Sequence, residues 1–404
     1  MKILYLGTVC DITEYERLLA NCKAKPSVAS IVFESSLLTG LKFCGADVEV
    51  YSYPMIPAFP TFRSLGWGSK TENLPCGYKC TWLKTINVPV IKQLSRRLDG
   101  RRIIKKWLKA NKGEDCVVLS YSIPPFLAKD IIKLAKKYGA KSIAIVTDLL
   151  RDMYINSQSK GMVKWAKNRY LSKAIALQGN FDAYVYLTEA MKDVVNLHAP
   201  YMIMEGIADV STVTDTEVQK ENAIMYAGAL EEKFGIINLI KAYKNSALKD
   251  TKLWIFGSGN ATEQIEKHAS LNKNICFFGR KSRDEILRYE KKALLLVNPR
   301  STRDEFTKYS FPSKTIEYMM SGTAMLTTKL AGIPKEYHSH LFLCEDNNVP
   351  ELQKALEHAL SFSEAELSAM GEKAKQFITE EKNANKQSAR LIDFMERVCS
   401  IDKS

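Results

Sequence analysis

The sequence predicts an α/β protein built from two doubly wound, Rossmann-like domains in tandem. Three observations support this prediction. Short apolar runs alternate with helical patterns, the same rhythm restarts halfway along the chain, and 404 residues exceed what one hydrophobic core usually supports. Apolar strands that alternate with helices are typical of parallel sheets with helices on both faces.

The first half contains the strands of the first expected domain, at 2–7, 47–52, 116–120, 142–147, 183–187 and 201–205. Helical patterns lie between them, for example at 124–138 and 188–197. Residues 206–222 are polar and lack apolar periodicity, so this segment is the expected linker between the domains.

The second half repeats the pattern, with strands expected at 223–227, 252–257, 274–278, 293–298 and 324–328. Helices are expected at 235–246, 261–269, 282–291, 313–321 and 348–360. Ser282 and Glu285 have the spacing of a capping box at the start of one of them. The final stretch, 363–399, is helical and amphipathic.

The apolar runs and the cysteines indicate in which compartment of the cell the protein is expected. No apolar run has the length of a membrane span, and the stretch from Met1 to Gly7 is too short for a secretory signal. The nine cysteines are an odd number, and only Cys76 and Cys80 lie close together, so no second pair completes a zinc site. We therefore expect reduced thiols, no bound metal and a cytoplasmic protein.

The positive charge of the chain lies in its first half. Residues 1–200 carry 30 Lys and Arg against 16 Asp and Glu, whereas residues 201–404 carry 28 against 29. Such asymmetry indicates an anionic partner for the first domain. Lipid headgroups, a lipid diphosphate and nucleic acid all fit this description.

Most of this charge comes from the stretch 84–112, which holds ten Lys and Arg and one acid, Asp99. Apolar residues recur in it at helix-like spacing. A cationic amphipathic segment with Trp is typical of a peripheral membrane surface, at about 1 kcal/mol per basic residue near anionic lipid. The alternative is a solvated basic face over an ordinary core helix. The residues expected at the membrane or acceptor are Arg96, Arg97, Arg101, Arg102, Lys105, Lys106 and Trp107.

The most informative stretch is 294–337. A strand ends near Arg300, a polar loop follows, and Pro312 and Ser313 open a helix. The amino end of a helix is an anion site, because its N–H groups are unpaired and the helix dipole favours negative charge there. Lys314 and Thr315 add donors suited to a diphosphate, and Glu317 is placed to accept hydrogen bonds from the vicinal hydroxyls of a ribose. An ordinary helix start with a solvated Lys and Glu is the alternative.

The run from Phe311 to Thr323 (FPSKTIEYMMSGT) resembles the donor-site signature of family-4 retaining glycosyltransferases. It is most similar to the branch that makes bacterial capsule, exopolysaccharide and the O-antigen of lipopolysaccharide. Segments 186–191, 226–236 and 328–337 extend the resemblance, which covers about 180–340.

The resemblance implies the GT-B architecture, in which two Rossmann-like domains face each other and the last helix crosses back to the first. It implies an acceptor-binding domain at 1–206, a domain that binds the nucleotide-sugar donor at 207–375, and a helix at 376–404 that packs on the first domain.

Carried over position by position, Glu317 matches the second Glu of the family's Glu-x7-Glu motif, which holds the donor ribose. Tyr309 stands at the first Glu, and Glu305 is the nearby acid that compensates. Ala229 replaces the family's Arg, and Lys233 and Arg300 are the expected catalytic cations. The expected donor-binding residues are Gly228, Ala229, Gly279, Arg280, Tyr309, Phe311, Pro312, Ser313, Lys314, Thr315 and Glu317.

The chemistry explains why cations are needed. Negative charge develops on the leaving nucleoside diphosphate, and each well-placed electrostatic contact contributes roughly 3–4 kcal/mol to its stabilisation. No metal is then required, and the sequence has no Asp-x-Asp motif. Retaining family members use front-side attack with little role for a protein base. Asp148, after the strand at 142–147, is the best acidic candidate in the first domain, and a surface carboxylate is the alternative.

The sequence therefore predicts a glycosyltransferase that moves a sugar from a nucleotide sugar, with UDP as the expected nucleotide, to a polyprenol-diphosphate-linked glycan. We expect it on the inner face of the cell membrane, with no cofactor and no nucleic-acid partner. One alternative is a GT-B nucleotide-sugar epimerase, which would not need the basic first half. The other is a nucleic-acid-binding protein, for which no helix-turn-helix, zinc or RNA-binding motif is present.

Overall fold

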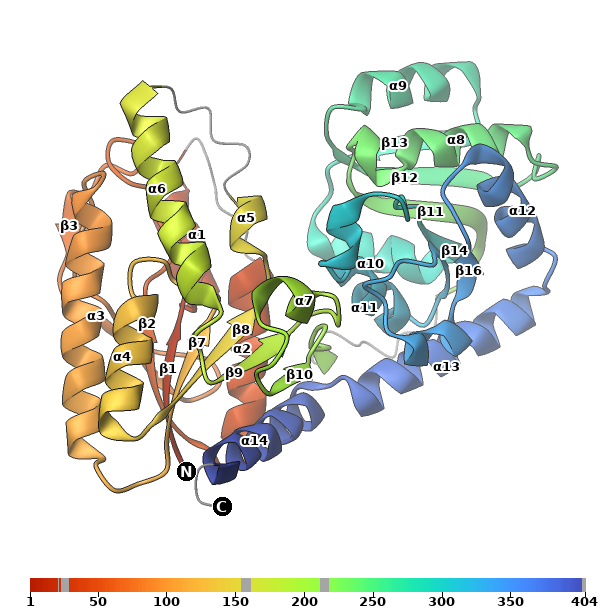
Figure 1. Ribbon diagram of the computed structural model, residues 1–404. Coiled ribbons are helices and arrows are strands. Elements are labelled where there is room, and N and C mark those ends of the chain that lie inside the picture. The colour runs from red at the N-terminus through yellow and green to blue at the C-terminus, as the bar shows by residue number, and fades with distance from the viewer. Residues whose placement is uncertain (21, 23–28, 154–160, 211–217, 402–404) are drawn as a thin grey trace. The chain divides into compact units, whose positions relative to one another are not determined.

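The computed structural model describes residues 1–20, 22, 29–153, 161–210 and 218–401 (Figure 1). The chain forms two compact units. Unit 1 comprises Met1–Ile207 and Ala384–Ser404, and unit 2 comprises Ala208–Asn383. Each unit contains its own parallel sheet.

Unit 1 is built on an eight-stranded sheet with the order β10-β9-β8-β7-β1-β2-β5-β4, in which β4 alone pairs antiparallel. Its strands are β1 (Lys2–Gly7), β2 (Asp47–Ser52), β4 (Thr71–Asn73), β5 (Lys79–Trp82), β7 (Cys116–Tyr121), β8 (Lys141–Val146), β9 (Ala183–Tyr186) and β10 (Tyr201–Ile203). Strands β3 (Gly66–Trp67) and β6 (Thr85–Ile86) form a separate ribbon. The helices are α1 (Ile12–Leu19), α2 (Ala29–Phe43), α3 (Ile91–Ala110), α4 (Ala128–Tyr138), α5 (Leu150–Met153), α6 (Gly161–Gln178), α7 (Met191–Val195) and α14 (Ala384–Ser400).

Unit 2 is built on a six-stranded, wholly parallel sheet with the order β13-β12-β11-β14-β15-β16. Its strands are β11 (Glu221–Ala229), β12 (Lys252–Ser258), β13 (Ile275–Gly279), β14 (Ala293–Asn298), β15 (Ala324–Thr328) and β16 (Phe342–Cys344). The helices are α8 (Ile236–Asn245), α9 (Thr262–Leu271), α10 (Arg283–Lys292), α11 (Ser313–Met320), α12 (Val349–Ala359) and α13 (Glu364–Glu381). The predicted capping box of Ser282 and Glu285 is present at α10.

Both faces of the unit 2 sheet are covered by hydrophobic side chains, because successive strand residues point to opposite faces. Along β11, Ile224 and Tyr226 belong to one buried cluster, whereas Met225 and Ala227 belong to another. This two-sided burial explains why the strands appear in the sequence as continuous apolar runs, and it confirms the predicted doubly wound α/β class.

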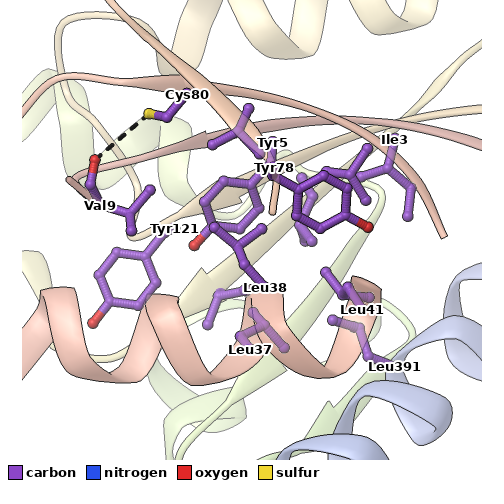
Figure 2. Packing of buried hydrophobic residues seen from close by; sticks show 14 of the residues in the cluster. Ile3, Tyr5, Val9, Leu37, Leu38, Leu41, Tyr78, Cys80, Tyr121 and Leu391 are labelled. Atoms are coloured by element: carbon purple, nitrogen blue, oxygen red, sulfur yellow. Dashed lines mark hydrogen bonds between the residues drawn. The ribbon is translucent and has the colours of Figure 1, made fainter. Parts of the chain in front are cut away.

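Helix α14 packs on unit 1 although it follows unit 2 in the chain. Figure 2 shows Leu391 beside Leu41 of α2, within the core that also holds Ile3 and Tyr5 of β1. Gly40 allows the close contact, since a Cβ atom there would lie 2.1 Å from the carbonyl oxygen of Ala384.

The structure corrects the expected end of the second domain. The chain passes from unit 2 to unit 1 at residues 383 and 384, not at 375 and 376, because α13 continues to Glu381 and packs against α11 and β15. The helical stretch 363–399 is two helices. They are separated where the Lys382 carbonyl accepts from the Ala208 amide at 2.8 Å.

Candidate functional site

The candidate site lies along the carboxyl edge of the unit 2 sheet. Strand β11 lies between β12 and the later strand β14, so the chain order reverses at β11. Ligands of doubly wound sheets bind outside the carboxyl ends of the strands at such a reversal. The segments that follow β11, β12, β13 and β14 therefore share one edge with the start of α11.

A close backbone approach brings the loops after β11 and β14 together. The 3-10 helix η2 (Glu232–Phe234) ends at Gly235, which has φ +83° and precedes α8. A Cβ atom at Gly235 would lie 1.9 Å from the carbonyl oxygen of Pro299, directly after β14. This close approach and the positive φ both require glycine. The contact places Phe234 beside Arg300.

Two of the predicted catalytic cations meet at the ring of Phe234. The guanidinium carbon of Arg300 lies 4.9 Å from the ring centroid, and Lys233 Nζ lies 5.2 Å from it. Phe306 packs edge-on against the same ring, with 6.5 Å between centroids. Burial lowers the pKa of Arg300, whereas the Lys233 side chain is exposed. Positive charge is thereby concentrated where β11 and β14 end.

The ends of β12 and β13 continue this edge. Gly257 has φ +130°, and a Cβ atom there would lie 1.8 Å from the carbonyl oxygen of Gly228, so β11 and β12 approach closely. Arg280 follows Gly279 and donates from Nε to Ser258 Oγ at 2.6 Å. Ala229, the position of the family's Arg, is exposed at the same edge.

The loop between β14 and α11 contains the position where the family motif has its first Glu. Tyr309 stands there, and its hydroxyl donates to Glu305 Oε1 at 3.5 Å. The structure thus brings together the departure from the motif and the acid predicted to compensate for it. Phe311 is buried, and its ring packs on Tyr337 with 5.6 Å between centroids.

Helix α11 begins without a side-chain cap, because its N-cap residue is Pro312. Ser313, the first helical residue, is exposed, and the Thr315 amide bonds the Pro312 carbonyl at 2.8 Å. The Thr315 side chain is buried, and its hydroxyl has no hydrogen-bond partner among the described residues. The start of α11 therefore retains the features of an anion site that the sequence predicts.

Lys314 is not positioned as the sequence predicts. Its ammonium group donates to Glu317 Oε1 and lies 3.9 Å from Glu290 Oε1 of α10, so it contacts carboxylates. Burial would raise the pKa of Glu317, but the charge of Lys314 and hydrogen bonds from Glu290 and Lys314 hold it below its ordinary value. Sequence reasoning missed Glu290. It lies in the charged run RDEILRYEKK, where nothing distinguishes a buried acid from exposed ones.

Asp148, the acidic candidate of unit 1, is exposed just after β8. The Thr147 hydroxyl lies 3.4 Å from its Oδ2 atom. Its place at the carboxyl end of a parallel strand is the predicted one.

Unit 1 also contains a buried polar cluster that sequence reasoning missed. Glu34 of α2 accepts hydrogen bonds from the Thr8 amide at 2.9 and 3.0 Å and from the Tyr5 hydroxyl at 2.9 Å. Gly7 makes room for it, since a Cβ atom there would lie 1.8 Å from Glu34 Oε2. Glu34 thereby fixes the loop after β1. The available signal was a single acid within an apolar helix.

The basic stretch forms α3, and the structure corrects two residues of the predicted surface. Arg96 is buried and donates to the carbonyl oxygen of Pro54 at 2.9 Å, and Trp107 is buried as well. Both lie on the face of α3 that packs against the rest of unit 1.

The other five predicted residues of this surface are on the outer side of α3. Arg97 and Arg101 pair with Asp130, with N–O distances of 2.6 and 3.0 Å. Arg102 pairs with Asp99 at 3.3 Å, and Lys105 and Lys106 are exposed.

The sequence of unit 2 matches a known protein family. Residues 214–393 match Glycosyl transferases group 1. The group 1 match spans the whole unit 2 sheet, the start of α11 and the beginning of α14. Among curated proteins, none matches the sequence.

Solved structures share the fold of the entire chain. Sucrose-phosphate synthase from Thermosynechococcus elongatus has a TM-score of 0.62 at 13% identity, with 98% of this chain and 99% of that chain covered. The catalytic domain of starch synthase IV from Arabidopsis thaliana has a TM-score of 0.64 at 11% identity, with 99% of each chain covered. Alr3699/HepE from Anabaena has a TM-score of 0.57 at 12% identity, with 98% and 100% covered.

These likenesses confirm the GT-B fold predicted from the sequence. The group 1 domain and the shared fold together support a glycosyltransferase enzyme.

Glu34 generates a prediction about the pH dependence of stability. Burial raises the pKa of Glu34 to about 7 from an ordinary value of 4.5, although hydrogen bonds from Thr8 and Tyr5 oppose the shift. The folded state then binds this proton more tightly than the unfolded state does. The contribution of Glu34 to stability is therefore complete below pH 4.5 and is lost as the pH rises to about 7, with an upper limit of about 3 kcal/mol.

Urea unfolding of the wild type and of Glu34→Gln between pH 4.5 and 8 measures this contribution. The free energy of unfolding of the wild type should fall relative to that of the variant as the pH rises. Parallel curves for the two proteins would show that Glu34 does not titrate in this range.

Proposed function

We propose that the chain is a retaining, metal-independent member of the family-4 glycosyltransferases that transfers a sugar from a nucleotide sugar to a lipid-linked glycan in cell-surface polysaccharide synthesis. One observation carries the proposal. Lys233 and Arg300, predicted as the catalytic cations, meet at one aromatic ring on the sheet edge where α11 also begins.

The cations suit the leaving group of this reaction. When the bond between the sugar and the diphosphate breaks, negative charge grows on the phosphate oxygens. Arg300 and Lys233 provide fixed positive charge for it, and the amide groups at the start of α11 provide donors. Arg300 is partly buried, so its charge is less screened by water than that of an exposed side chain. These groups supply the charge stabilisation that a metal ion would otherwise provide.

In the proposed complex, different residues contact the nucleotide and the sugar of the donor. Glu317 accepts the ribose hydroxyls, because it lies one turn into α11 and remains partly exposed. Gly279, the last residue of β13, and Arg280, directly after it, border the base. Tyr309 and Glu305 lie where the family contacts the transferred sugar, and their hydrogen bond presents a carboxylate there.

UDP is the proposed nucleotide. The Anabaena structure with the same fold is a complex with UDP, and that of starch synthase IV is bound to ADP and acarbose. Both relatives carry a nucleoside diphosphate, which is the part of the donor that the cations and Glu317 are placed to hold in this chain.

The acceptor is proposed to be a polyprenol-diphosphate-linked glycan, which requires access to a membrane surface on unit 1. At the amino end of α3, large apolar side chains are exposed: Val90 by 89%, Leu94 by 54% and Leu98 by 62%. Val90 also has φ +69°, a conformation that β-branched residues rarely adopt. We name Val90, Ile91, Leu94 and Leu98 the α3 apolar edge.

Basic side chains continue along the same helix, at Arg101, Arg102, Lys105 and Lys106. An apolar edge beside cationic side chains fits the headgroup region of an anionic bilayer. No helix in the described parts of the chain is apolar over the length that a bilayer crossing needs. We propose peripheral attachment to the inner face of the cell membrane through this helix.

The cation assignment predicts that Arg300→Ala and Lys233→Ala each lower the turnover number by about a hundredfold or more, since each removes one charge from the leaving group. The measurement is nucleoside diphosphate release from a panel of UDP- and GDP-sugars, with membrane extract as the acceptor source. Arg288→Ala removes an exposed Arg of α10 and serves as the control with unchanged turnover. Full turnover in both site variants would reject the assignment.

The membrane assignment predicts that the wild type sediments with vesicles containing phosphatidylglycerol more than with phosphatidylcholine vesicles. Lys105→Glu/Lys106→Glu should weaken this binding about tenfold or more, because each basic residue contributes about 1 kcal/mol near anionic lipid. Leu94→Ser/Leu98→Ser should weaken binding to a similar degree by removing buried apolar area. Leu271→Ser, at a site in unit 2 that is 72% exposed, is the matched control. Equal sedimentation with both kinds of vesicle contradicts the assignment.

A further inference from the structure

A buried acid in unit 2 has no role in the function proposed above. Glu290, near the end of α10, has no exposed surface. If both Glu290 and its acidic neighbour are ionised, neither carboxylate oxygen of Glu290 has a hydrogen-bond partner among the described residues. Isolated buried carboxylates are costly, and those without donors need an explanation.

The Glu290 side chain faces the start of α11. Lys314 Nζ lies 3.9 Å from its Oε1 atom, and the Glu290 and Glu317 carboxyl groups are close enough that each shifts the pKa of the other. Lys314 makes its closer contact with Glu317. Two acids and one base therefore share a small volume at the proposed ribose site.

Charge balance restricts how these groups ionise. If both acids were ionised, two negative charges would face each other with one ammonium group between them, and Glu290 would still lack a donor. If Glu290 is neutral, its O–H group supplies a donor to Glu317 and the remaining carboxylate pairs with Lys314. Both acids then have partners, and the buried position carries no charge.

The geometry points to Glu290 as a positioning residue that is held as the neutral acid and donates a hydrogen bond to Glu317, fixing that carboxylate for the ribose of the donor. The ribose part of this inference rests on the proposed function. With Lys314 on one side and Glu290 on another, the orientation of Glu317 is set before the nucleotide arrives, which lowers the entropy lost on binding.

The titration behaviour agrees with this geometry. Burial raises the pKa of Glu290 far above its ordinary value, and the charge of Glu317 raises it further, whereas Lys314 and Arg283 oppose the shift. Tyr318 of α11 also faces Glu290, and its own pKa is raised by burial and then by the charge of Glu290. Above the pH at which Glu290 loses its proton, the two carboxylates repel and Glu317 loses its donor.

The test compares Glu290→Gln, which keeps an N–H donor and cannot titrate, with Glu290→Leu, which removes the donor. Calorimetry measures binding of UDP, GDP and ADP between pH 6 and 10, and thermal melting reports folding. Glu290→Gln should bind the preferred nucleotide within about threefold of the wild type at pH 7 and lack its alkaline loss of affinity. Glu290→Leu should bind about tenfold to a hundredfold more weakly, the range expected for a lost hydrogen bond to a charged group.

Infrared difference spectroscopy tests the protonation state without any nucleotide. The wild type minus Glu290→Gln should show the carbonyl band of a protonated carboxylic acid that shifts in D2O. The absence of this band, or an alkaline loss of affinity that persists in Glu290→Gln, overturns the inference. If the wild type binds none of the nucleotides, the proposed function fails, and the infrared band still decides the state of Glu290. If Glu290→Leu does not fold, the Glu290→Gln comparisons remain decisive.

Discussion

The site in unit 2 depends on the pairing of β14 with β11, the first strand of its sheet. Beyond the paired strand residues, the backbone of Gly235 lies against the carbonyl of Pro299, where a Cβ atom would approach to 1.9 Å. The contact joins the loop after β11 to the loop after β14. Phe234, Lys233 and Arg300 are adjacent as a consequence, although Arg300 lies far along the chain from the other two.

Charge is distributed along this edge in two groups. Lys233 and Arg300 contact an aromatic ring, and neither forms an ion pair with a carboxylate of the described residues, so their positive charge is available to an incoming anion. Lys314 instead lies among carboxylates, where it keeps Glu317 ionised beside the buried Glu290. The first group fits phosphates and the second fits hydroxyl groups.

Much of the fold was predictable because strands buried on both faces leave continuous apolar runs. The runs at 2–7, 293–298 and 324–328 are strands with those same bounds, and so is 47–52, whose residues alternate between buried and more exposed. Helix α2 was not named among the expected helices, since its apolar residues lack a clear period, and α1 was not named although it has an apolar face with Tyr15 and Leu19 buried. The short strands β3 to β6 carry too few residues for any period. The break between α13 and α14 depends on a tertiary hydrogen bond to Ala208, which local sequence does not encode.

The candidate site was predictable where a motif or the end of a strand marked it, as for Arg300, Ser313 and Glu317. It was not predictable where the environment decides the role. Glu290 and Glu34 have the same residue type as many surface acids, and only burial distinguishes them. Arg96 and Trp107 were placed on the membrane surface because a basic run does not show which face of its helix packs inward.

The central claim is that one sheet edge holds the diphosphate through Arg300 and the ribose through Glu317. Calorimetric binding of UDP and of 2′,3′-dideoxy-UDP to the wild type, Arg300→Ala and Glu317→Ala tests both parts at once. The account predicts that Glu317→Ala weakens UDP about tenfold and leaves the dideoxy analogue unchanged, whereas Arg300→Ala weakens both ligands equally. Equal losses for both ligands in Glu317→Ala, or no loss in Arg300→Ala, would contradict it.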